Sequence, residues 1–343
     1  MHKDDFDVAL IPGMRERLAQ AYARFRAAQD AFQEGESRIA SAASTRVRCP
    51  GCDAPAGEAE PLFVARSLRH VRCRRCALVF TLDVLAGEAD RALYQPNTAM
   101  AAYLALKEGP DYARLERDKA RYLASLAARF GARGAFLDIG CSTGALMAAA
   151  REEGFEPYGL DANPDMVERA RARFGGRAAT GYFPDALPSD WPRFGAIAIL
   201  DLLEHMVEPK VFLGQLAERL DPAGLLLVQV PNFDSLIVQL EGPANTNFCH
   251  GHWTHFTAAT LAPLARSAGF TELAHETIIS ELDRIRAFPR ERIAAALARL
   301  APAYRGGVEG LDAAELHRML LGYKLVAVFR KGPPGPAAPI LSR

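Results

Sequence analysis

Three histidines stand close together in the segment FCHGHWTHFT, residues 248–257. His250, His252 and His255 are three of the eight histidines of the chain. Imidazoles can transfer protons near neutral pH, bind metal ions, or serve as polar residues at the start of a helix. The segment holds no Asp or Glu that would complete a common metal-ligand set. We therefore rank proton transfer ahead of metal binding, and expect at least one of the three to buttress the following helix.

A fourth histidine, His205, ends the motif LLEH. It follows an apolar strand-like stretch, so it is a second candidate for proton transfer. The structural alternative has equal weight: a residue at the start of a helix, held by Glu204.

Six cysteines supply the second group of side chains with a chemical role. Four of them form two C-x2-C pairs, Cys49 with Cys52 and Cys73 with Cys76, separated by twenty residues. This spacing is typical of a tetrahedral four-thiolate zinc site, which has no open position and stabilises a segment too small to fold alone. A nucleic-acid-binding zinc finger is the alternative, and three arginines around the second pair favour it.

The charge balance of the chain argues against nucleic acid as a partner. The 343 residues carry 41 Lys and Arg against 41 Asp and Glu, whereas nucleic-acid binding usually needs a basic excess. No apolar run approaches a membrane span, and the first residues, MHKDDFDVAL, are too charged for a signal peptide. We expect a cytoplasmic protein without a membrane partner, and leave a homodimer as one option.

Before residue 131 the expected elements are helical, except for the segment that carries the four paired cysteines. Helical spacing of apolar residues predicts a helical segment over residues 1–45 and a helical linker or cap over 83–130. The four cysteines lie between them, so we expect a small zinc ribbon at 46–82.

From residue 131 the pattern changes. Apolar strands alternate with helices over residues 131–331, which predicts an α/β domain with a parallel sheet covered by helices on both faces. Residues 289–320 are expected to form a helical insertion, which is too long for a simple loop. The proline-rich tail, residues 332–343, is expected to be disordered.

The strongest chemical signal in this domain is FLDIGCSTG, residues 136–144. A buried strand brings Asp138 to its carboxyl end, and the chain then turns through Gly140 and Gly144 into a helix. Glycines allow close approach of the backbone to a ligand, and the helix start offers unpaired N–H groups. The order D-x-G-x-x-x-G departs from the G-x-G-x-x-G of dinucleotide sites.

The second strand ends in GLDAN and brings Asp161 to the same edge of the sheet. Its carboxylate could accept hydrogen bonds from both ribose hydroxyls of an adenosyl group. The structural alternative is a helix N-cap beside Pro164.

Four motifs in order, LDIGCSTG, YGLDAN, FGAIAILDLLEH and LDPAGLLLVQVPN, resemble the class I S-adenosylmethionine-dependent methyltransferases over about residues 110–331. The one departure is Ala223, where the family has the first glycine of a pair. The resemblance implies a Rossmann-like, seven-stranded, mostly parallel sheet and S-adenosylmethionine as cofactor. Carried over by position, it implies a set of cofactor-binding residues: Asp138, Gly140, Cys141, Gly144, Asp161, Asp185, Leu200 and Asp201.

The cysteine-rich segment and the histidine segment resemble a narrower group, the zinc-ribbon-bearing sugar C-methyltransferases. In that alignment His252 falls on a catalytic histidine, but Gly251 stands where the family has its catalytic glutamate. Cys249 and His255 stand where the family has tyrosines. The missing glutamate puts sugar C-methylation in doubt, while His252 remains the leading general base.

We therefore expect a methyltransferase that acts on a small-molecule acceptor, in specialised biosynthesis, with S-adenosylmethionine and a structural zinc ion. A nucleotide-sugar C-methyltransferase is the first alternative. A zinc-ribbon RNA-binding protein, or a methyltransferase-like protein that only binds partners, is the alternative from another class.

Overall fold

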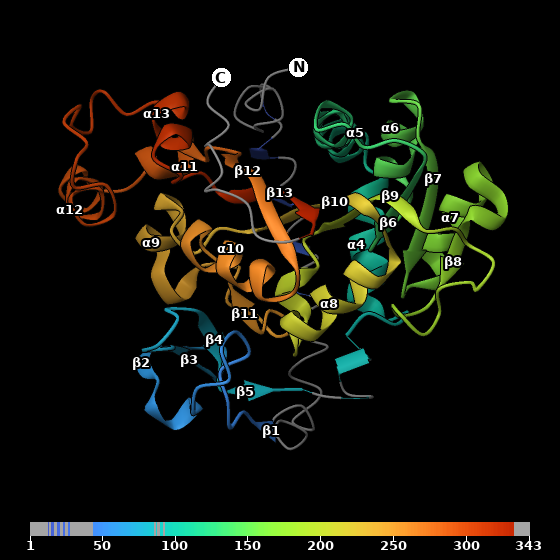
Figure 1. The fold of residues 1–343 in the computed structure, drawn as a ribbon. Coiled ribbons are helices and arrows are strands. Elements are labelled where there is room, and N and C mark those ends of the chain that lie inside the picture. Colours follow the sequence, from blue (N-terminus) through green and yellow to red (C-terminus); the bar gives the residue numbers. More distant parts are fainter. Residues whose placement is uncertain are drawn as a thin grey trace. The chain divides into compact units, whose positions relative to one another are not determined.

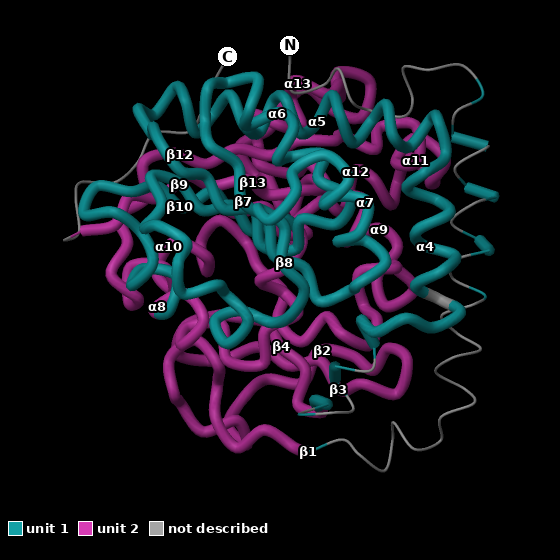
Figure 2. The backbone as a smooth tube through the Cα atoms, turned by 90° about the vertical axis from the view of Figure 1, so that its right-hand side faces the viewer, with its two compact units in different colours: residues 1–44, 84–200, 215–227 teal, residues 45–83, 201–214, 228–343 magenta. Residues whose placement is uncertain are grey.

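The computed structural model describes residues 44–85, 87, 90–91 and 93–332, together with a few isolated positions between 13 and 27. The helical segment expected over residues 1–45 and the tail expected at 332–343 therefore lie almost wholly outside the described residues. The chain divides into two compact units, which Figure 2 colours separately. Unit 1 comprises residues 1–44, 84–200 and 215–227, and unit 2 comprises 45–83, 201–214 and 228–343.

Four strands run through unit 1 and pair in the order β9-β6-β7-β8 (Figure 1). They are β6 (Ala135–Ile139), β7 (Glu156–Asp161), β8 (Ala178–Thr180) and β9 (Phe194–Leu200). β6 is parallel to both β7 and β9, and β7 is parallel to β8. The β9 strand is buried over almost its whole length, as expected for a parallel strand covered on both faces.

Helices precede and connect the strands of unit 1. α4 (Thr98–Glu108) and α5 (Pro110–Arg129) come before β6, α6 (Ala145–Glu152) connects β6 to β7, and α7 (Pro164–Phe174) with the 3-10 turn η3 (Gly175–Arg177) connects β7 to β8. The α5 helix begins with Pro110 in its first turn, where no backbone N–H is needed, and it buries one apolar face. The parallel strands thus alternate with helices, as the sequence pattern predicts.

Unit 2 begins with an antiparallel sheet in the order β11-β4-β3-β2. Its strands are β2 (Glu60–Ala65), β3 (Leu68–Arg72), β4 (Val79–Thr81) and β11 (Thr254–His255). In the β11–β4 pair, Thr254 lies opposite Phe80 and His255 opposite Val79. The histidine-rich segment is therefore a strand of the sheet that carries the cysteines, although some 170 residues separate them in the chain.

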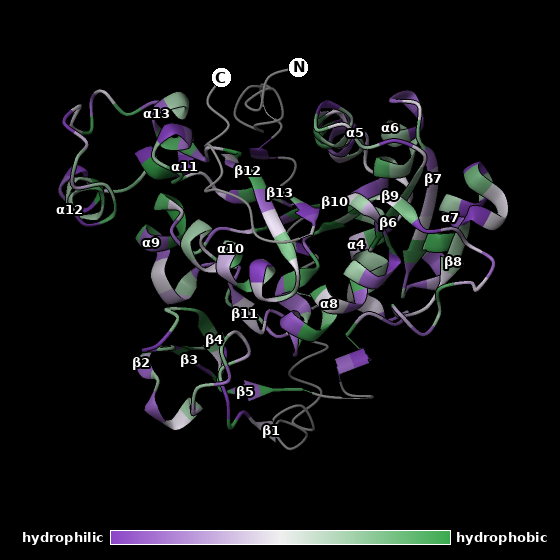
Figure 3. Cartoon of the chain, viewed as in Figure 1, coloured by the Kyte–Doolittle hydropathy of each residue, from purple (hydrophilic) through white to green (hydrophobic). Residues whose placement is uncertain are grey.

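The rest of unit 2 consists of an antiparallel strand pair and several helices. The strands are β12 (Phe270–Ile278) and β13 (Lys324–Lys331). The helices are α9 (Leu236–Glu241), α10 (Ala258–Ser267), α11 (Leu282–Arg286), α12 (Arg290–Leu300) and α13 (Ala313–Arg318). Unit 2 also contains the 3-10 turns η2 (Ala56–Glu58), η4 (Leu203–His205) and η5 (Gly242–Ala244). Helix α12 carries both hydrophilic and hydrophobic residues (Figure 3), and it buries Ile293, Ala296 and Leu297. The helical material expected over 289–320 is thus present as α12 and α13.

Four elements have residues in both units: the short strands β1 (Ser44–Thr45) and β5 (Asp83–Val84), helix α8 (Pro209–Arg219) and strand β10 (Leu220–Pro231). The large sheet has seven strands in the order β12-β13-β10-β9-β6-β7-β8, and a separate two-stranded sheet joins β1 with β5. The expected fold class, an α/β protein with a mostly parallel seven-stranded sheet, is confirmed.

Candidate functional site

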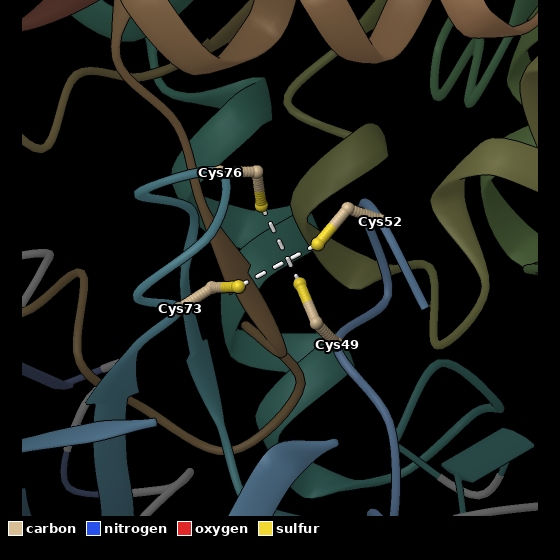
Figure 4. A group of neighbouring side chains, drawn as sticks. All are labelled: Cys49, Cys52, Cys73 and Cys76. Carbon is tan, nitrogen blue, oxygen red and sulfur yellow. Dashed lines mark hydrogen bonds between the residues drawn. The ribbon is translucent and has the colours of Figure 1, made fainter. Parts of the chain in front are cut away.

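The four paired cysteines of unit 2 converge on one point (Figure 4). Their sulfur atoms all lie within 4.8 Å of one another, with 3.6 Å between Sγ of Cys49 and Cys76 and 3.5 Å between Sγ of Cys52 and Cys73. Four thiolates at about 2.3 Å from a zinc ion form a tetrahedron with edges of about 3.8 Å. Both sulfur–sulfur separations are close to that edge, so the cluster fits a four-thiolate zinc site.

Both cysteine pairs sit in the same kind of turn. Backbone N–H groups of Gly51 and Arg75 each donate to the first sulfur of their pair at 3.4 Å. In each pair the residue after the second cysteine is left-handed, with φ of 60° at both Asp53 and Ala77. Glycine is the residue that adopts this conformation at least cost, so Ala77 is held in a conformation that glycine would suit better.

The electrostatics of the cluster also favour a bound cation. The hydrogen bond with Cys76, followed by burial, raises the pKa of Cys49. Burial likewise raises the pKa of the half-buried Cys52 thiol. Placing several negatively charged thiolates side by side costs free energy. A bound metal ion would offset this cost.

In unit 1 the glycine loop has the conformation that its sequence requires. Gly140, Ser142 and Gly144 all have positive φ, at 82°, 49° and 82°. Gly144 also caps helix α6, and a Cβ atom at this position would lie 3.0 Å from the Phe174 ring. The loop is therefore held close to helix α7, with the N-terminus of α6 directly after it.

Cys141 lies in the core rather than in the open part of this loop. Its side chain is 3% exposed and packs in a cluster with Met147, Val167 and Ala170. Burial raises the pKa of its thiol well above the usual range, so Cys141 is not a nucleophile. The family resemblance implies that Cys141 contacts the cofactor. Because its side chain is buried, only its backbone remains available to a ligand.

Asp161 holds the loop through its side chain. Its Oδ2 accepts the backbone N–H of Ser142 at 2.8 Å, and its Oδ1 accepts the N–H of Asn163 at 2.8 Å. Burial raises its pKa in spite of these two bonds. Asp161 is not the N-cap of α7, because Asn163 takes that position and accepts from the N–H groups of Asp165 and Met166.

Asp138 is 3% exposed at the end of β6. Burial, followed by the charge of Asp161, raises the pKa of Asp138 to about 8, so the side chain is largely protonated at neutral pH. A protonated carboxyl can donate a hydrogen bond as well as accept one.

Sequence reasoning missed a buried cation in unit 1. The Nζ of Lys107, on α4, bonds Oε2 of Glu116 at 2.9 Å, and Lys119 bonds the other carboxylate oxygen at 2.9 Å. Glu116 holds the pKa of Lys107 above its usual range although burial opposes this, and the positive charge of Lys107 lowers the pKa values of Asp138 and Asp161. No sequence motif marks Lys107, because its partner lies in the next helix.

The three remaining residues of the expected cofactor set have different surroundings. Asp185 is exposed in a turn after β8, and Leu200 ends β9. The carboxylate of Asp201, in unit 2, bonds Nζ of Lys324 at 2.8 Å and Nε2 of Gln229 at 2.9 Å. The Asp201 carboxylate thus holds the side chains of Lys324 and Gln229 in place.

In unit 2 the structure unites two of the four expected histidines. The rings of His205 and His252 lie edge to face, with centroids 4.6 Å apart. Glu204 joins them: one potential ligand atom of each of the three residues lies within 4.8 Å of the others. The carboxylate that the segment 248–257 lacks is therefore supplied by η4, far away in the sequence.

His250 and His255 do not belong to this group. His250 lies in the turn before Gly251. His255 is 5% exposed on β11, with its ring 5.1 Å from His70 and 5.1 Å from Phe248. Burial lowers its pKa well below the usual range, so His255 is a core imidazole. Trp253 and Phe256, fully buried, also anchor the segment in the core.

Among the described residues, none of the helices combines the length and the apolar character needed to cross a bilayer.

Comparison with known proteins gives a family match. Residues 112–275 match the family described as "Methyltransferase domain". A ubiquinone biosynthesis O-methyltransferase from Xylella fastidiosa is 29% identical over 116 residues. That match covers 32% of this chain and 46% of the relative, so it spans less than half of the relative's length.

Solved structures with a similar arrangement are also methyltransferases by name. A complex of the Haloferax volcanii Trm112 methyltransferase activator with a methyltransferase matches at 20% identity and a TM-score of 0.45, over 67% of this chain and 97% of that one. The Burkholderia thailandensis 1,6-didemethyltoxoflavin N1-methyltransferase, with bound S-adenosylhomocysteine, matches at 16% identity and a TM-score of 0.45, over 80% and 99%. Both TM-scores are below 0.5, and the match to the methyltransferase family covers residues 112–275, slightly less than half of the chain.

Proposed function

We propose that the chain is an S-adenosylmethionine-dependent methyltransferase that acts on a small-molecule acceptor in specialised biosynthesis. The observation that carries this proposal is the loop of residues 138–144, tied by Asp161 at the carboxyl ends of β6 and β7, within the region that matches the methyltransferase family. Ligands of open α/β sheets bind at this edge.

The proposed cofactor-binding set follows from this loop. Gly140, Gly144 and the backbone of Cys141 would approach the methionine and ribose, and Asp161 would face the ribose hydroxyls. Asp138 would contribute a protonated carboxyl, which can donate a hydrogen bond as well as accept one. Leu200, Asp201 and Asp185 complete the set proposed from the family resemblance, with Asp185 toward the adenine.

Methyl transfer is an in-line displacement. The acceptor's lone pair forms a bond to the methyl carbon, the carbon–sulfur bond breaks, and its electron pair stays on sulfur, which leaves as the neutral thioether of S-adenosylhomocysteine. The protein's contribution is orientation, together with removal of a proton where the acceptor carries one. We propose His252 for that proton, with His205 beside it as the second candidate.

The proposed zinc ion is structural. Cys49, Cys52, Cys73 and Cys76 would hold it with four thiolates, which leaves no position for substrate. Zinc analysis of the purified chain should find an ion that Cys73→Ser loses. An unchanged zinc content in this variant would refute the assignment.

A nucleotide-sugar C-methyltransferase remains the second candidate, supported by the combination of cysteine cluster and histidine segment. Gly251, with φ of 93°, occupies the place of the glutamate that such enzymes use, which counts against it. Binding of a thymidine diphosphate sugar would favour this candidate. Salt-dependent RNA binding would instead favour the zinc-ribbon RNA-binding alternative.

Calorimetric titration with S-adenosylhomocysteine tests the proposed function. Wild type should bind with micromolar affinity, and Asp161→Ala should lose most of this binding. Asp165→Ala is the matched control, because Asp165 is an exposed aspartate in the first turn of α7. Absence of binding to folded, zinc-loaded wild type would refute the methyltransferase function and favour a protein that only binds partners.

The role of His252 needs a second experiment. Transfer of a labelled methyl group to a panel of small hydroxyl- and amino-bearing metabolites should be abolished in His252→Ala, with little loss of S-adenosylhomocysteine affinity. His275→Ala is the control, because His275 lies on β12 and bonds Glu272. Normal turnover in His252→Ala would show that this residue takes no part.

A further inference from the structure

We propose that Glu204, His205 and His252 bind one divalent transition-metal ion, at a site distinct from the four cysteines. All three residues belong to unit 2, and one ligand atom of each lies within 4.8 Å of the others. Two imidazoles and one carboxylate form a common ligand set for Zn²⁺, Fe²⁺ and related ions. The inference does not depend on cofactor binding, but a metal bound here would replace the general-base role proposed for His252.

Glu204 is the first observation that points to a cation. The residue is 1% exposed, and both carboxylate oxygens are buried without a hydrogen-bond partner. A buried carboxylate without partners is costly, and proteins normally satisfy it with a hydrogen bond, a charge or a metal ion.

The two imidazoles are oriented as metal ligands usually are. Nδ1 of His205 lies 2.8 Å from the carbonyl oxygen of Gly251, and Nδ1 of His252 lies 2.9 Å from that of Asn247. A carbonyl oxygen only accepts, so Nδ1 carries the hydrogen in both rings, and Nε2 of neutral His252 keeps its lone pair. His205 also has a hydrogen-bonding contact with the backbone of Asp201. Metal-binding histidines typically donate their other ring N–H to a backbone carbonyl in this way.

Neutral imidazole is the form that binds a metal. Metal binding at these nitrogens would replace the base function proposed for His252.

The backbone holds the two halves of the site together. The N–H of Trp253 donates to the carbonyl oxygen of Glu204 at 2.8 Å, and Trp253 is fully buried. Together with the bond from His205 to Gly251, this contact joins η4 to the segment before β11. The ligand atoms, which lie within 4.8 Å of one another, would need to close by up to about 1.4 Å to reach the roughly 3.4 Å separations of a tetrahedral site.

One neighbouring charge opposes a cation. Lys324 lowers the pKa values of Glu204, His205 and His252, and thus contributes a positive potential at the site. Its Nζ is bonded to Oδ1 of Asp201 at 2.8 Å, so a carboxylate largely offsets this charge. Three protein ligands would leave at least one position for water or for a heteroatom of an acceptor.

Metal titration of the zinc-loaded, full-length chain tests the proposal. Mn²⁺ is the probe, because it prefers carboxylate and imidazole ligands and does not compete for four thiolates. The free Mn²⁺ signal in electron paramagnetic resonance should report one site per chain, and Co²⁺ should compete for it. Glu204→Gln and His252→Ala should each weaken binding at least about tenfold. His275→Ala, outside the site, should leave it unchanged.

The proposal would be overturned if wild type bound neither Mn²⁺ nor Co²⁺ with a dissociation constant below 1 mM (roughly −4 kcal/mol). It would also be overturned if binding survived in both Glu204→Gln and His252→Ala. Loss of binding in His275→Ala as well would be a third contradicting result. Thermal unfolding without added metal shows whether each variant folds, and Glu204→Gln preserves the shape of the side chain. S-adenosylhomocysteine binding on the same samples separates the two proposals. Metal binding without cofactor binding would refute only the proposed function, and the reverse result would refute only this inference.

Discussion

Gly159 of strand β7 lies directly against Cys141 of the glycine loop: a Cβ atom at Gly159 would lie 2.8 Å from the Cys141 sulfur. It would also lie 2.5 Å from the Met147 sulfur. These distances are shorter than real Cβ atoms show, so the absence of a side chain at Gly159 allows the loop to close on the strand. The loop conformation thus depends on a glycine outside the loop.

Gly159→Ala should therefore destabilise unit 1. The added methyl group forces Cys141 and Met147 to move within a close-packed core, which typically costs about 1–3 kcal/mol. Urea unfolding measures this change. Gly176→Ala is the control, because nothing lies within 4 Å of a Cβ at that position, and it should change stability by less than about 0.5 kcal/mol. Equal effects of the two substitutions would contradict the packing argument.

Ala77→Gly should stabilise the cysteine-bearing segment. Ala77 has φ of 60°, a conformation that costs an alanine about 1 kcal/mol and a glycine almost nothing. Differential scanning calorimetry of the zinc-loaded chain should show a higher midpoint for this variant. Ala59→Gly, where φ is −67°, is the matched substitution and should lower the midpoint. A lower midpoint in both would show that Ala77 is not strained.

Asp138 should make the stability of the chain fall as pH rises. Its folded-state pKa is about 8, above the ordinary value of 3.8, so the folded chain keeps a proton that the unfolded chain loses. The free energy of unfolding therefore decreases from about pH 4 to about pH 8 and is level above it, by several kcal/mol at most. Urea unfolding between pH 5 and pH 8 measures the slope.

The aspartate variant isolates this contribution from other buried acids. Asp138→Asn cannot titrate, so the difference in unfolding free energy between it and wild type should change across this pH range. Asp185→Asn, at an exposed position, should follow the wild-type curve. A constant difference for Asp138→Asn would show that Asp138 is ionised throughout.

His255→Leu should raise stability. The Nε2 atom of His255 is buried without a hydrogen-bond partner, which costs about 1–3 kcal/mol, and leucine fills a similar volume without a polar atom. A melting-temperature increase of a few degrees is expected. His275→Leu removes a paired imidazole instead and should not raise the midpoint. A lower midpoint for His255→Leu would reveal a partner for this ring.

Local spacing was sufficient for the features whose residues act together within a few positions. The two C-x2-C pairs predicted the four-sulfur cluster, since each pair forms its turn by itself and the cluster needs only that the two turns meet. The alternation of apolar strands and helices predicted a parallel sheet covered by helices, because each buried strand and its helix carry their own periodicity, while the family resemblance implied its seven strands.

Tertiary structure decided the rest, because it depends on contacts between residues far apart in the chain. The segment 248–257 does not show that His255 turns into the core against His70, or that His252 joins His205 and Glu204, whose backbone reaches it through Trp253. The loop sequence likewise does not show that Asp138 lies beside the buried pair of Lys107 and Glu116. Burial and charge pairing set the pKa of each of these groups, and both arise only when the chain has folded.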